Sequence, residues 1–235
     1  MQKILLNTGL FVKKGVYDIN TAIEIIDKLP VDGVEIGLSF LDQLKNFRLS
    51  QQSFSILKKK EFVSIHAPVN FLYSNDAYTK DVLNKLKQVY DLVNAQYAVF
   101  HLHTIKDLSI FDDSSLTICM ENDRGVYNQD AEVIKKILEP YPKLKFLLDT
   151  NHAMSVSEKE VGALVKKLKS RILAIHLSIW YQQEEHVPCH LVSEEALAQA
   201  EPIKKLDIPI VLESWHKYQD NIGKEIEFVK NWLTI

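Results

Sequence analysis

The amino-acid sequence predicts an α/β protein that forms a single (β/α)8 barrel domain over residues 1–235. Two observations predict this fold. Short apolar segments rich in Val, Ile and Leu recur at nearly regular intervals, and most of the intervening segments have helical periodicity. Eight such segments in a chain of 235 residues are typical of a small barrel. A doubly wound open sheet is the competing fold, but only "NTG" stands where it would carry a glycine-rich phosphate-binding turn.

The eight apolar segments are the predicted strands, and they cover residues 3–9, 33–38, 62–68, 97–103, 116–121, 145–150, 172–178 and 208–214. Helices are predicted after Thr21 and over 78–94, 129–139, 157–170, 193–206 and 219–233, where apolar residues follow helical spacing. Thr21 with Glu24, and Ser157 with Glu160, have the spacing of capping boxes. Residues 104–115 are too few for a full crossover helix, so we expect a shortened or missing helix between strands four and five.

The composition is that of an ordinary soluble globular protein, with 46% apolar and 25% charged residues. The net charge of -3 and the presence of only three arginines argue against a strongly electrostatic nucleic-acid binder. Two cysteines do not make a disulfide framework, which favours a cytoplasmic location. No apolar segment approaches the length of a membrane span, and the first one is broken by Asn7, unlike a signal peptide.

Every histidine lies at the predicted C-terminal end of a strand or in the loop after it, and none is predicted in a helix. The eight are His66, His101, His103, His152, His176, His186, His190 and His216. One such histidine is more often a hydrogen-bonded structural residue than a ligand. Eight at the end of the barrel where active sites lie are difficult to explain by packing alone.

Carboxylates end the strands at the same place. Glu121 ends the fifth strand, Asp149 the sixth and Glu213 the eighth, while His176 lies near the end of the seventh. Strand alternation turns these four side chains toward the barrel axis. Crowded carboxylates repel one another and are costly to desolvate, and a divalent cation removes both penalties. Oxygen and nitrogen ligands together suit Mn²⁺, Zn²⁺, Co²⁺ or Mg²⁺.

The stretch "LLDTNHAMS" over 147–155 alone allows a simpler interpretation, a strand that runs into a turn capped by Asp149. Its similarity to a known family favours a functional role. The motifs "VSIHAP", "VFHLH", "CMEND", "LLDTNHA", "AIHLS", "EEHVP" and "VLES" resemble those of the xylose-isomerase-like barrels. That family includes sugar isomerases, sugar epimerases and the endonuclease IV type of apurinic endonuclease. At the level of strand spacing, the resemblance covers the whole chain.

The resemblance implies site residues at matching positions. Glu121, Asp149, His176 and Glu213 match the metal site of the isomerase and epimerase members. His66, His101, His152 and His186 match positions that bind further zinc ions in the endonuclease branch, which has aspartate where this chain has Glu184. These histidines and Glu184 are the candidates for binding a further metal or the substrate.

Three further residues are candidate substrate contacts. Arg124, just after Glu121, is the best-placed arginine for an anionic substrate group, unless it is merely exposed. His103 faces the same way as His101, one step further out. Glu35 points inward from the second strand and either orients the substrate or is a buried carboxylate paired with its neighbours.

The leading functional hypothesis is a metal-dependent isomerase or epimerase of a small sugar, sugar phosphate or related hydroxy-carbonyl compound. In it, Glu121 and Glu213 transfer the proton and the metal stabilises an enediolate. The alternative is a zinc-dependent phosphodiesterase of the endonuclease IV type, which the acidic net charge and scarce arginines disfavour without removing nucleic acid as a partner. A barrel that only binds a ligand is the third hypothesis, disfavoured by the two retained glutamates. We expect no nucleotide cofactor, and a homo-oligomer is compatible with the sequence.

Overall fold

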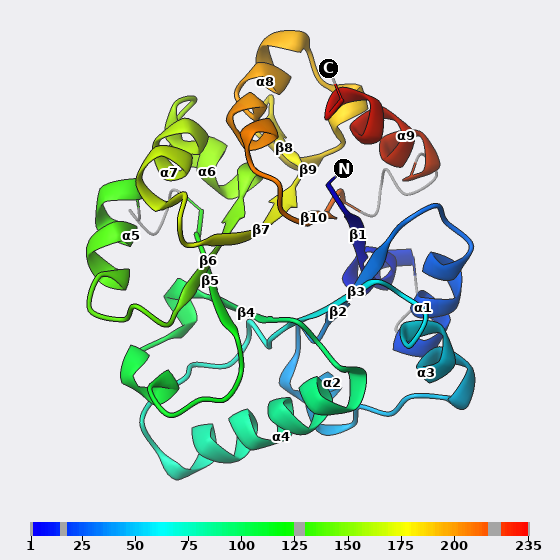
Figure 1. The fold of residues 1–235 in the computed structure, drawn as a ribbon, viewed down its shortest axis with the longest axis vertical. Helices are drawn as coiled ribbons and strands as arrows, with labels where there is room; N and C mark the ends of the chain where they lie inside the picture. The colour runs from blue at the N-terminus through cyan, green and yellow to red at the C-terminus, as the bar shows by residue number, and fades with distance from the viewer. Residues whose placement is uncertain (1, 15–17, 125–129, 216–221, 235) are drawn as a thin grey trace.

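Eight parallel strands close into a barrel, and helices surround it on the outside (Figure 1). The computed structural model describes residues 2–14, 18–124, 130–215 and 222–234. The strands follow one another around the barrel in the order β1-β10-β7-β6-β5-β4-β3-β2. This confirms the predicted (β/α)8 barrel.

Each barrel strand lies within one of the predicted apolar segments. The strands are β1 Ile4–Asn7, β2 Gly33–Gly37, β3 Phe62–His66, β4 Ala98–His101, β5 Ile118–Glu121, β6 Lys145–Asp149, β7 Ile172–Leu177 and β10 Ile210–Leu212. A small antiparallel hairpin of β8 (Ile179–Tyr181) and β9 (Glu184–Val187) follows β7 and was not predicted. It lies at the end of the barrel where the strands finish, so it adds to the walls of the mouth.

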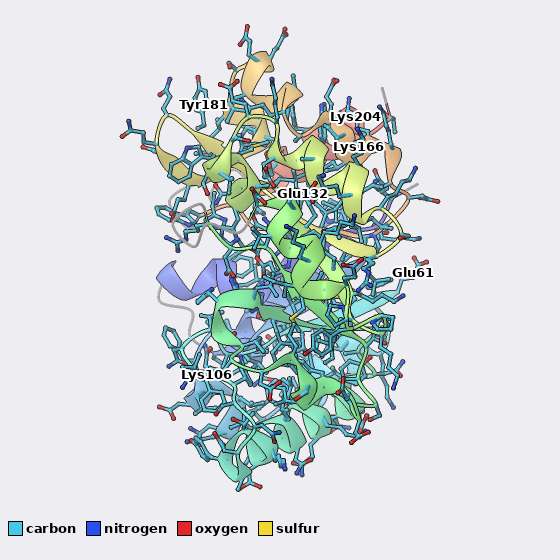
Figure 2. The ribbon with its side chains drawn as sticks, turned by 90° about the vertical axis from the view of Figure 1, so that its left-hand side faces the viewer. Glu61, Lys106, Glu132, Lys166, Tyr181 and Lys204 are labelled. Atoms are coloured by element: carbon cyan, nitrogen blue, oxygen red, sulfur yellow. The ribbon has the colours of Figure 1, made fainter. Side chains whose placement is uncertain are left out.

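The α-helices are α1 Ile19–Asp27, α2 Leu41–Lys45, α3 Gln51–Leu57, α4 Ala77–Val93, α5 Ala131–Leu138, α6 Thr150–Val156, α7 Glu160–Leu168, α8 Glu194–Ala198 and α9 Ile222–Trp232. Short 3-10 helices are η1 Thr8–Lys14, η2 Leu102–Thr104, η3 Leu108–Phe111, η5 Cys189–Leu191 and η6 Glu201–Lys205. Charged side chains such as those of Glu132 on α5 and Lys166 on α7 lie on the outer surface (Figure 2).

The connection between β4 and β5 contains only η2 and η3, which confirms the shortened helix expected there. The predicted helix over 193–206 is broken into α8 and η6 because Pro202 starts a new helical turn after Ala200. The predicted helix 219–233 is described only from Ile222 onward.

Both predicted capping boxes are wrong. Helix α1 begins after Asp18, whose carboxylate accepts the backbone N–H of Thr21, so an earlier aspartate takes the capping position. Helix α7 has Lys159 at its N-cap without a side-chain hydrogen bond. Glu160 instead accepts the backbone N–H of Ala131 at the start of α5, so a contact between helices replaced the local one.

Two apolar cores flank the strands. The smaller one fills the barrel interior and contains Tyr97, Val99, Cys119, Leu147 and Ala174. The larger one lies mainly between the strands and the surrounding helices. Cys119 and Ala174 lie inside the barrel two residues before Glu121 and His176, as the alternation of strand residues predicts. Within the described residues, no helix has both the length and the apolar composition that a membrane crossing needs.

Gly33 in β2 packs tightly between residues of β1 and β3. A Cβ atom there would lie 2.3 Å from the backbone oxygen of Phe62 and 2.8 Å from Leu5 Cγ. We therefore expect Gly33→Ala to lower the free energy of unfolding by about 1–3 kcal/mol through overpacking, measured by urea denaturation. Gly223→Ala in α9 is the matched control, because no described residue would lie within 4 Å of a Cβ atom there, and it should raise stability by about 0.5–1 kcal/mol. Equal effects of the two substitutions would contradict this packing.

Candidate metal centre

Four ligand-type side chains converge at the C-terminal end of the barrel. Glu121 ends β5, Asp149 ends β6, His176 lies near the end of β7, and Glu213 follows β10. One ligand atom from each lies within 4.8 Å of the others. His176 Nδ1 is 3.4 Å from Glu121 Oε1 and 3.3 Å from Glu213 Oε2. It is 4.0 Å from Asp149 Oδ2. The structure thus brings together the four residues that the sequence analysis placed at a metal.

Burial makes this concentration of charge costly. Asp149 and His176 are fully buried, and Glu121 almost so. Burial raises the pKa of Asp149 to about 7, and the charges of Glu121 and Glu213 add to that rise against the opposing charge of His152. Burial also opposes ionisation of Glu213, but the charge of His176 outweighs it and lowers the pKa of this carboxyl to about 2.

His176 is the imidazole that these carboxylates share. Burial lowers its pKa, but the charges of Glu213, Glu35 and Glu121 outweigh burial and raise the pKa well above its usual value. Glu35 Oε1 lies 2.9 Å from His176 Nε2, without the alignment of a hydrogen bond. The other ring nitrogen, Nδ1, faces the ligand carboxylates.

The donor atoms fit a divalent cation. Among the described residues, neither His176 Nδ1 nor Asp149 Oδ2 has a hydrogen-bond partner, although both atoms are buried. Such atoms cost free energy unless something satisfies them. A cation between the four side chains would take a lone pair from each atom and offset the repulsion between the carboxylates. Three carboxylates and one imidazole suit Zn²⁺, Mn²⁺, Co²⁺ or Mg²⁺.

Asp149 also caps a helix. Its Oδ1 accepts the backbone N–H of His152 at 2.6 Å, which starts α6, while Oδ2 is the unpartnered atom at the centre. The two interpretations of "LLDTNHAMS" are therefore compatible, since one carboxylate serves both purposes. His152 lies in α6, so the prediction that all histidines lie outside helices is wrong. His103 and His190 also lie in short 3-10 helices.

Residues of β1, β2 and β3 form a hydrogen-bond network beside the candidate metal centre. The amide Nδ2 of Asn7 donates to Glu35 Oε1 at 2.9 Å and to Glu213 Oε1 at 2.8 Å. Ser64 donates to Glu35 Oε2 at 2.9 Å. Glu35 is therefore a fully buried carboxylate paired with its neighbours. The sequence analysis did not place Asn7 at the site, although a polar residue that interrupts an apolar strand was a usable signal.

A second group of imidazoles lies on the other side of Glu121. Its Oε2 is 3.2 Å from His66 Nε2 and 3.3 Å from His101 Nε2. His101, Glu121 and His152 form one further group whose ligand atoms lie within 4.8 Å of one another, and His66, Glu121 and His176 form another. Three of the four additional histidines that we expected at the site are thus in contact with Glu121 or its ligand groups.

Backbone carbonyl oxygens lie next to the Nδ1 atoms of His66 and His152. His66 Nδ1 lies 3.1 Å from the carbonyl oxygen of Ala67, and His152 Nδ1 lies 2.9 Å from that of Asn122. Because a carbonyl only accepts, these nitrogens carry the proton. In the neutral rings, Nε2 then carries a lone pair and is able to bind a metal.

A cavity of about 460 Å³ opens above these groups, which is within the range of small-molecule sites. Glu121 and Glu213 line it, as do His66, His101, His152 and His186. Leu10, Phe40, Val69 and Trp215 give it an apolar wall. Asp149 and His176 are buried outside its lining, so only two of the four ligand residues face the space where a substrate would lie.

His186 reaches this cavity from the hairpin with a backbone φ of 52°. Its backbone N–H donates to Asn151 Oδ1 at 2.8 Å, and its ring stacks on Trp215. Burial lowers the pKa of His186 to about 4, so its imidazole is neutral near pH 7. Glu184, two residues earlier, is exposed on β9 and belongs to none of the ligand groups found among the described residues. The structure therefore does not bring Glu184 to the site.

Arg124 and His103 lie at the rim of the same cavity. Arg124 forms an ion pair with Glu185 at 2.8 Å, and its side chain is half exposed. His103 contacts Asp123, a buried carboxylate that the sequence analysis missed. Of the remaining histidines, His190 pairs with Glu225, and His216 lies outside the described residues.

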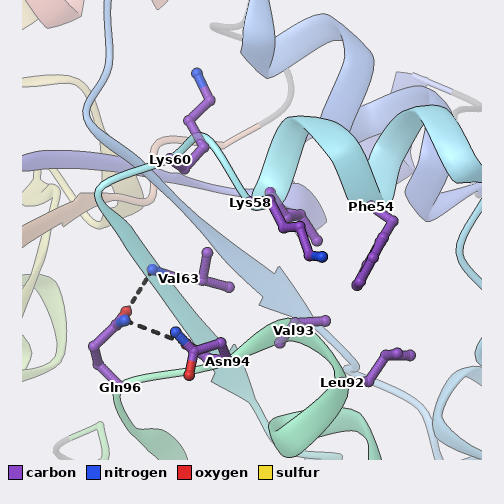
Figure 3. A pocket seen from close by; sticks show the side chains of 9 residues that line it. Phe54, Lys58, Lys60, Val63, Leu92, Val93, Asn94 and Gln96 are labelled. Carbon is purple, nitrogen blue, oxygen red and sulfur yellow. Dashed lines mark hydrogen bonds between the residues drawn. The ribbon is translucent and has the colours of Figure 1, made fainter.

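The opposite end of the barrel has a different kind of cavity. A space of about 290 Å³ lies beside the ends of α3 and α4, and Gln96 there hydrogen-bonds the backbone of Val63 and Asn94 (Figure 3). Among the described residues that line it, none is a carboxylate, imidazole or thiol. The chemistry is therefore concentrated at the C-terminal end of the strands, where barrel enzymes have their active sites.

The histidines make the metal-free protein sensitive to high pH. Burial lowers the pKa of His66 and His152, but interactions with Glu121 and Asp149 outweigh it and raise the values from 6.5 to about 9 and about 10. Their stabilising effect is complete below pH 6.5 and is lost as pH rises through the folded-state values. The free energy of unfolding of chelator-treated protein should therefore fall between pH 7 and 10, by up to about 1.4 kcal/mol per pH unit for each proton. A flat profile by urea denaturation would contradict these ion pairs.

No protein-family model and no curated protein matches the chain, but solved structures do. A D-tagatose 3-epimerase-like protein aligns with a TM-score of 0.70 at 15% identity, over 99% of this chain and 100% of that one. Endonuclease IV from Thermus thermophilus aligns with a TM-score of 0.61 at 14% identity, over 96% and 99%. A xylose isomerase domain containing protein from Salmonella typhimurium aligns with a TM-score of 0.61 at 17% identity, over 100% and 98%. The chain therefore shares the (β/α)8 barrel fold of these proteins.

Proposed function

We propose that this protein is a metal-dependent isomerase or epimerase of a small sugar, sugar phosphate or related hydroxy-carbonyl compound. One observation carries the proposal. Glu121 and Glu213 face the cavity, whereas Asp149 and His176, which complete the ligand group, are buried beneath it. Glu121 and Glu213 would therefore both bind the metal and lie next to a bound substrate. A cavity of about 460 Å³ accommodates a monosaccharide or its phosphate.

Glu213 is the carboxylate best placed to accept a proton from carbon. Its side chain keeps 15% of its surface exposed, compared with 1% for Glu121. Asn7 donates a hydrogen bond to Oε1, which fixes the orientation of the carboxylate. A positioned carboxylate base supplies about 10²–10⁴-fold in rate. Glu121 lies in the same cavity wall and is the proposed second proton-transfer group.

Other residues bind and orient the substrate in this proposal. His152 and His186 face the cavity and would hydrogen-bond hydroxyl groups, and Trp215 and Phe40 would pack against the carbon skeleton. A divalent cation bound at the four ligands would supply Lewis-acid stabilisation of a neighbouring oxyanion. Support comes also from the shared fold with a D-tagatose 3-epimerase-like protein.

A zinc-dependent phosphodiesterase is the second candidate. It is favoured by His66 and His101, whose Nε2 atoms both face Glu121 Oε2 and offer ligands for a further ion. Two observations weigh against it. Glu184 is exposed on β9, and neither Glu184 nor His186 belongs to a ligand group found among the described residues. The net charge of -3 also gives a phosphate backbone little to bind.

Deuterium exchange tests the proposal directly. Protein loaded with manganese, cobalt, zinc or magnesium would be incubated in D₂O with a panel of ketoses, aldoses and their phosphates, and followed by NMR. We expect deuterium at the carbon beside the carbonyl of at least one sugar, and no exchange after chelation. Glu213→Gln should slow the exchange by at least about 100-fold, because the amide cannot accept the proton. Glu61→Gln, on an exposed residue at the other end of the barrel, is the control.

The same preparations would be assayed on a DNA duplex with one abasic site. Strand cleavage together with no sugar exchange would reverse the order of the two candidates. Metal binding without either activity would leave only the ligand-binding barrel.

A further inference from the structure

Asp123 links two histidines at the rim of the candidate metal centre. Its Oδ1 is 2.9 Å from His101 Nδ1 and 2.5 Å from His103 Nδ1. Its Oδ2 accepts the backbone N–H of His103 at 2.7 Å. Only 1% of the side-chain surface of Asp123 is exposed. A buried carboxylate that uses both oxygens on two neighbouring residues is held in one orientation.

These contacts determine which nitrogen of His101 carries the proton. Asp123 Oδ2 accepts the backbone N–H of His103, and Oδ1 faces the Nδ1 atoms of both rings, an arrangement that suits an ionised carboxylate. An ionised carboxylate only accepts, so the Nδ1 atoms of both rings must donate. His101 Nδ1 forms a hydrogen bond with Asp123 at 2.9 Å, whereas Nε2 contacts Glu121 Oε2 at 3.3 Å without the alignment of a hydrogen bond. A neutral imidazole has a single proton. That proton lies on Nδ1, and Nε2 keeps its lone pair.

We propose that Asp123 is a positioning residue that fixes the Nδ1–H tautomer and the ring orientation of His101. Nε2 of His101 then presents its lone pair 3.3 Å from Glu121 Oε2. In the ligand group of His101, Glu121 and His152, this places an imidazole donor beside a shared carboxylate. Carboxylates that hold the outer nitrogen of a ligand histidine commonly set metal affinity in this way. The link to metal binding rests on the proposed function, whereas the tautomer of His101 does not.

Asparagine at this position has a defined consequence. Asp123→Asn has the same shape, and its carbonyl oxygen is able to keep the hydrogen bond to the His103 backbone N–H. Its NH₂ group then faces the two Nδ1 atoms, which must become acceptors. The opposite amide orientation would set NH₂ against the backbone N–H. The proton of His101 therefore moves to Nε2, where it blocks the lone pair directed at Glu121.

The first test reads the tautomer by ¹⁵N–¹H correlation NMR on metal-free protein at pH 7.5, with His101 assigned by loss of its signals in His101→Asn. We expect the Nδ1–H form in the wild type and the Nε2–H form in Asp123→Asn. Asp107→Asn is the control, because Asp107 lies in the same connection and, among the described residues, its carboxylate hydrogen-bonds to Ser109 alone. An Nε2–H ring in the wild type, or the same tautomer in wild type and Asp123→Asn, overturns the proposal. The wild-type spectrum decides even if the variant fails to fold.

The second test is a zinc titration of the same proteins by calorimetry. The equivalent bound after the first should be weakened about 10–100-fold in Asp123→Asn and unchanged in Asp107→Asn. Equal zinc affinities in wild type and Asp123→Asn would overturn the effect on the metal. A wild-type protein that binds no zinc, manganese or cobalt would refute the proposed function, and the NMR result would still decide the role of Asp123.

Discussion

The crowding of three carboxylates around one buried imidazole is the constraint on which the rest of the site depends. Glu121, Asp149 and Glu213 lie around His176 Nδ1, and Glu35 lies against the other nitrogen of the same ring. Without a cation, the repulsion is offset by protons on the histidines and by hydrogen bonds such as those from Asn7 to Glu213 and from the backbone N–H of His152 to Asp149. The repulsion between the carboxylates therefore lowers the stability of the metal-free fold, and the fold keeps the four ligands in place despite this cost.

The barrel provides the geometry because its strands are in fixed register. His101 pairs with Glu121 on neighbouring strands, and Asp149 pairs with His176. Asn7 pairs with Glu35 in the same way on the first two strands. Parallel strands of a closed barrel end together, so residues far apart in the chain meet at one mouth without any local motif. The helices and the interior apolar cluster supply the stability that offsets the buried charges.

The eight strands and the four proposed ligands were predictable because both follow from periodicity. Apolar segments identify the strands, and polar residues at their ends identify the mouth. The cap of α7 was not predictable in the same way, because Glu160 bonds to a different helix. Asn7 and Asp123 were missed because their partners are distant in the sequence. Asn7 contacts Glu35, 28 residues away, and Asp123 contacts His103, 20 residues away. The hairpin that carries His186 was missed because its strands are short, and it turns Glu184 outward.

Anomalous diffraction from crystals soaked in manganese or zinc tests the central claim most directly. The account predicts a peak about 2.0–2.2 Å from His176 Nδ1 and from carboxylate oxygens of Glu121, Asp149 and Glu213. It also predicts that His176 Nε2 stays against Glu35. A peak bound by other residues, or no peak at these four ligands at neutral pH, would contradict the account.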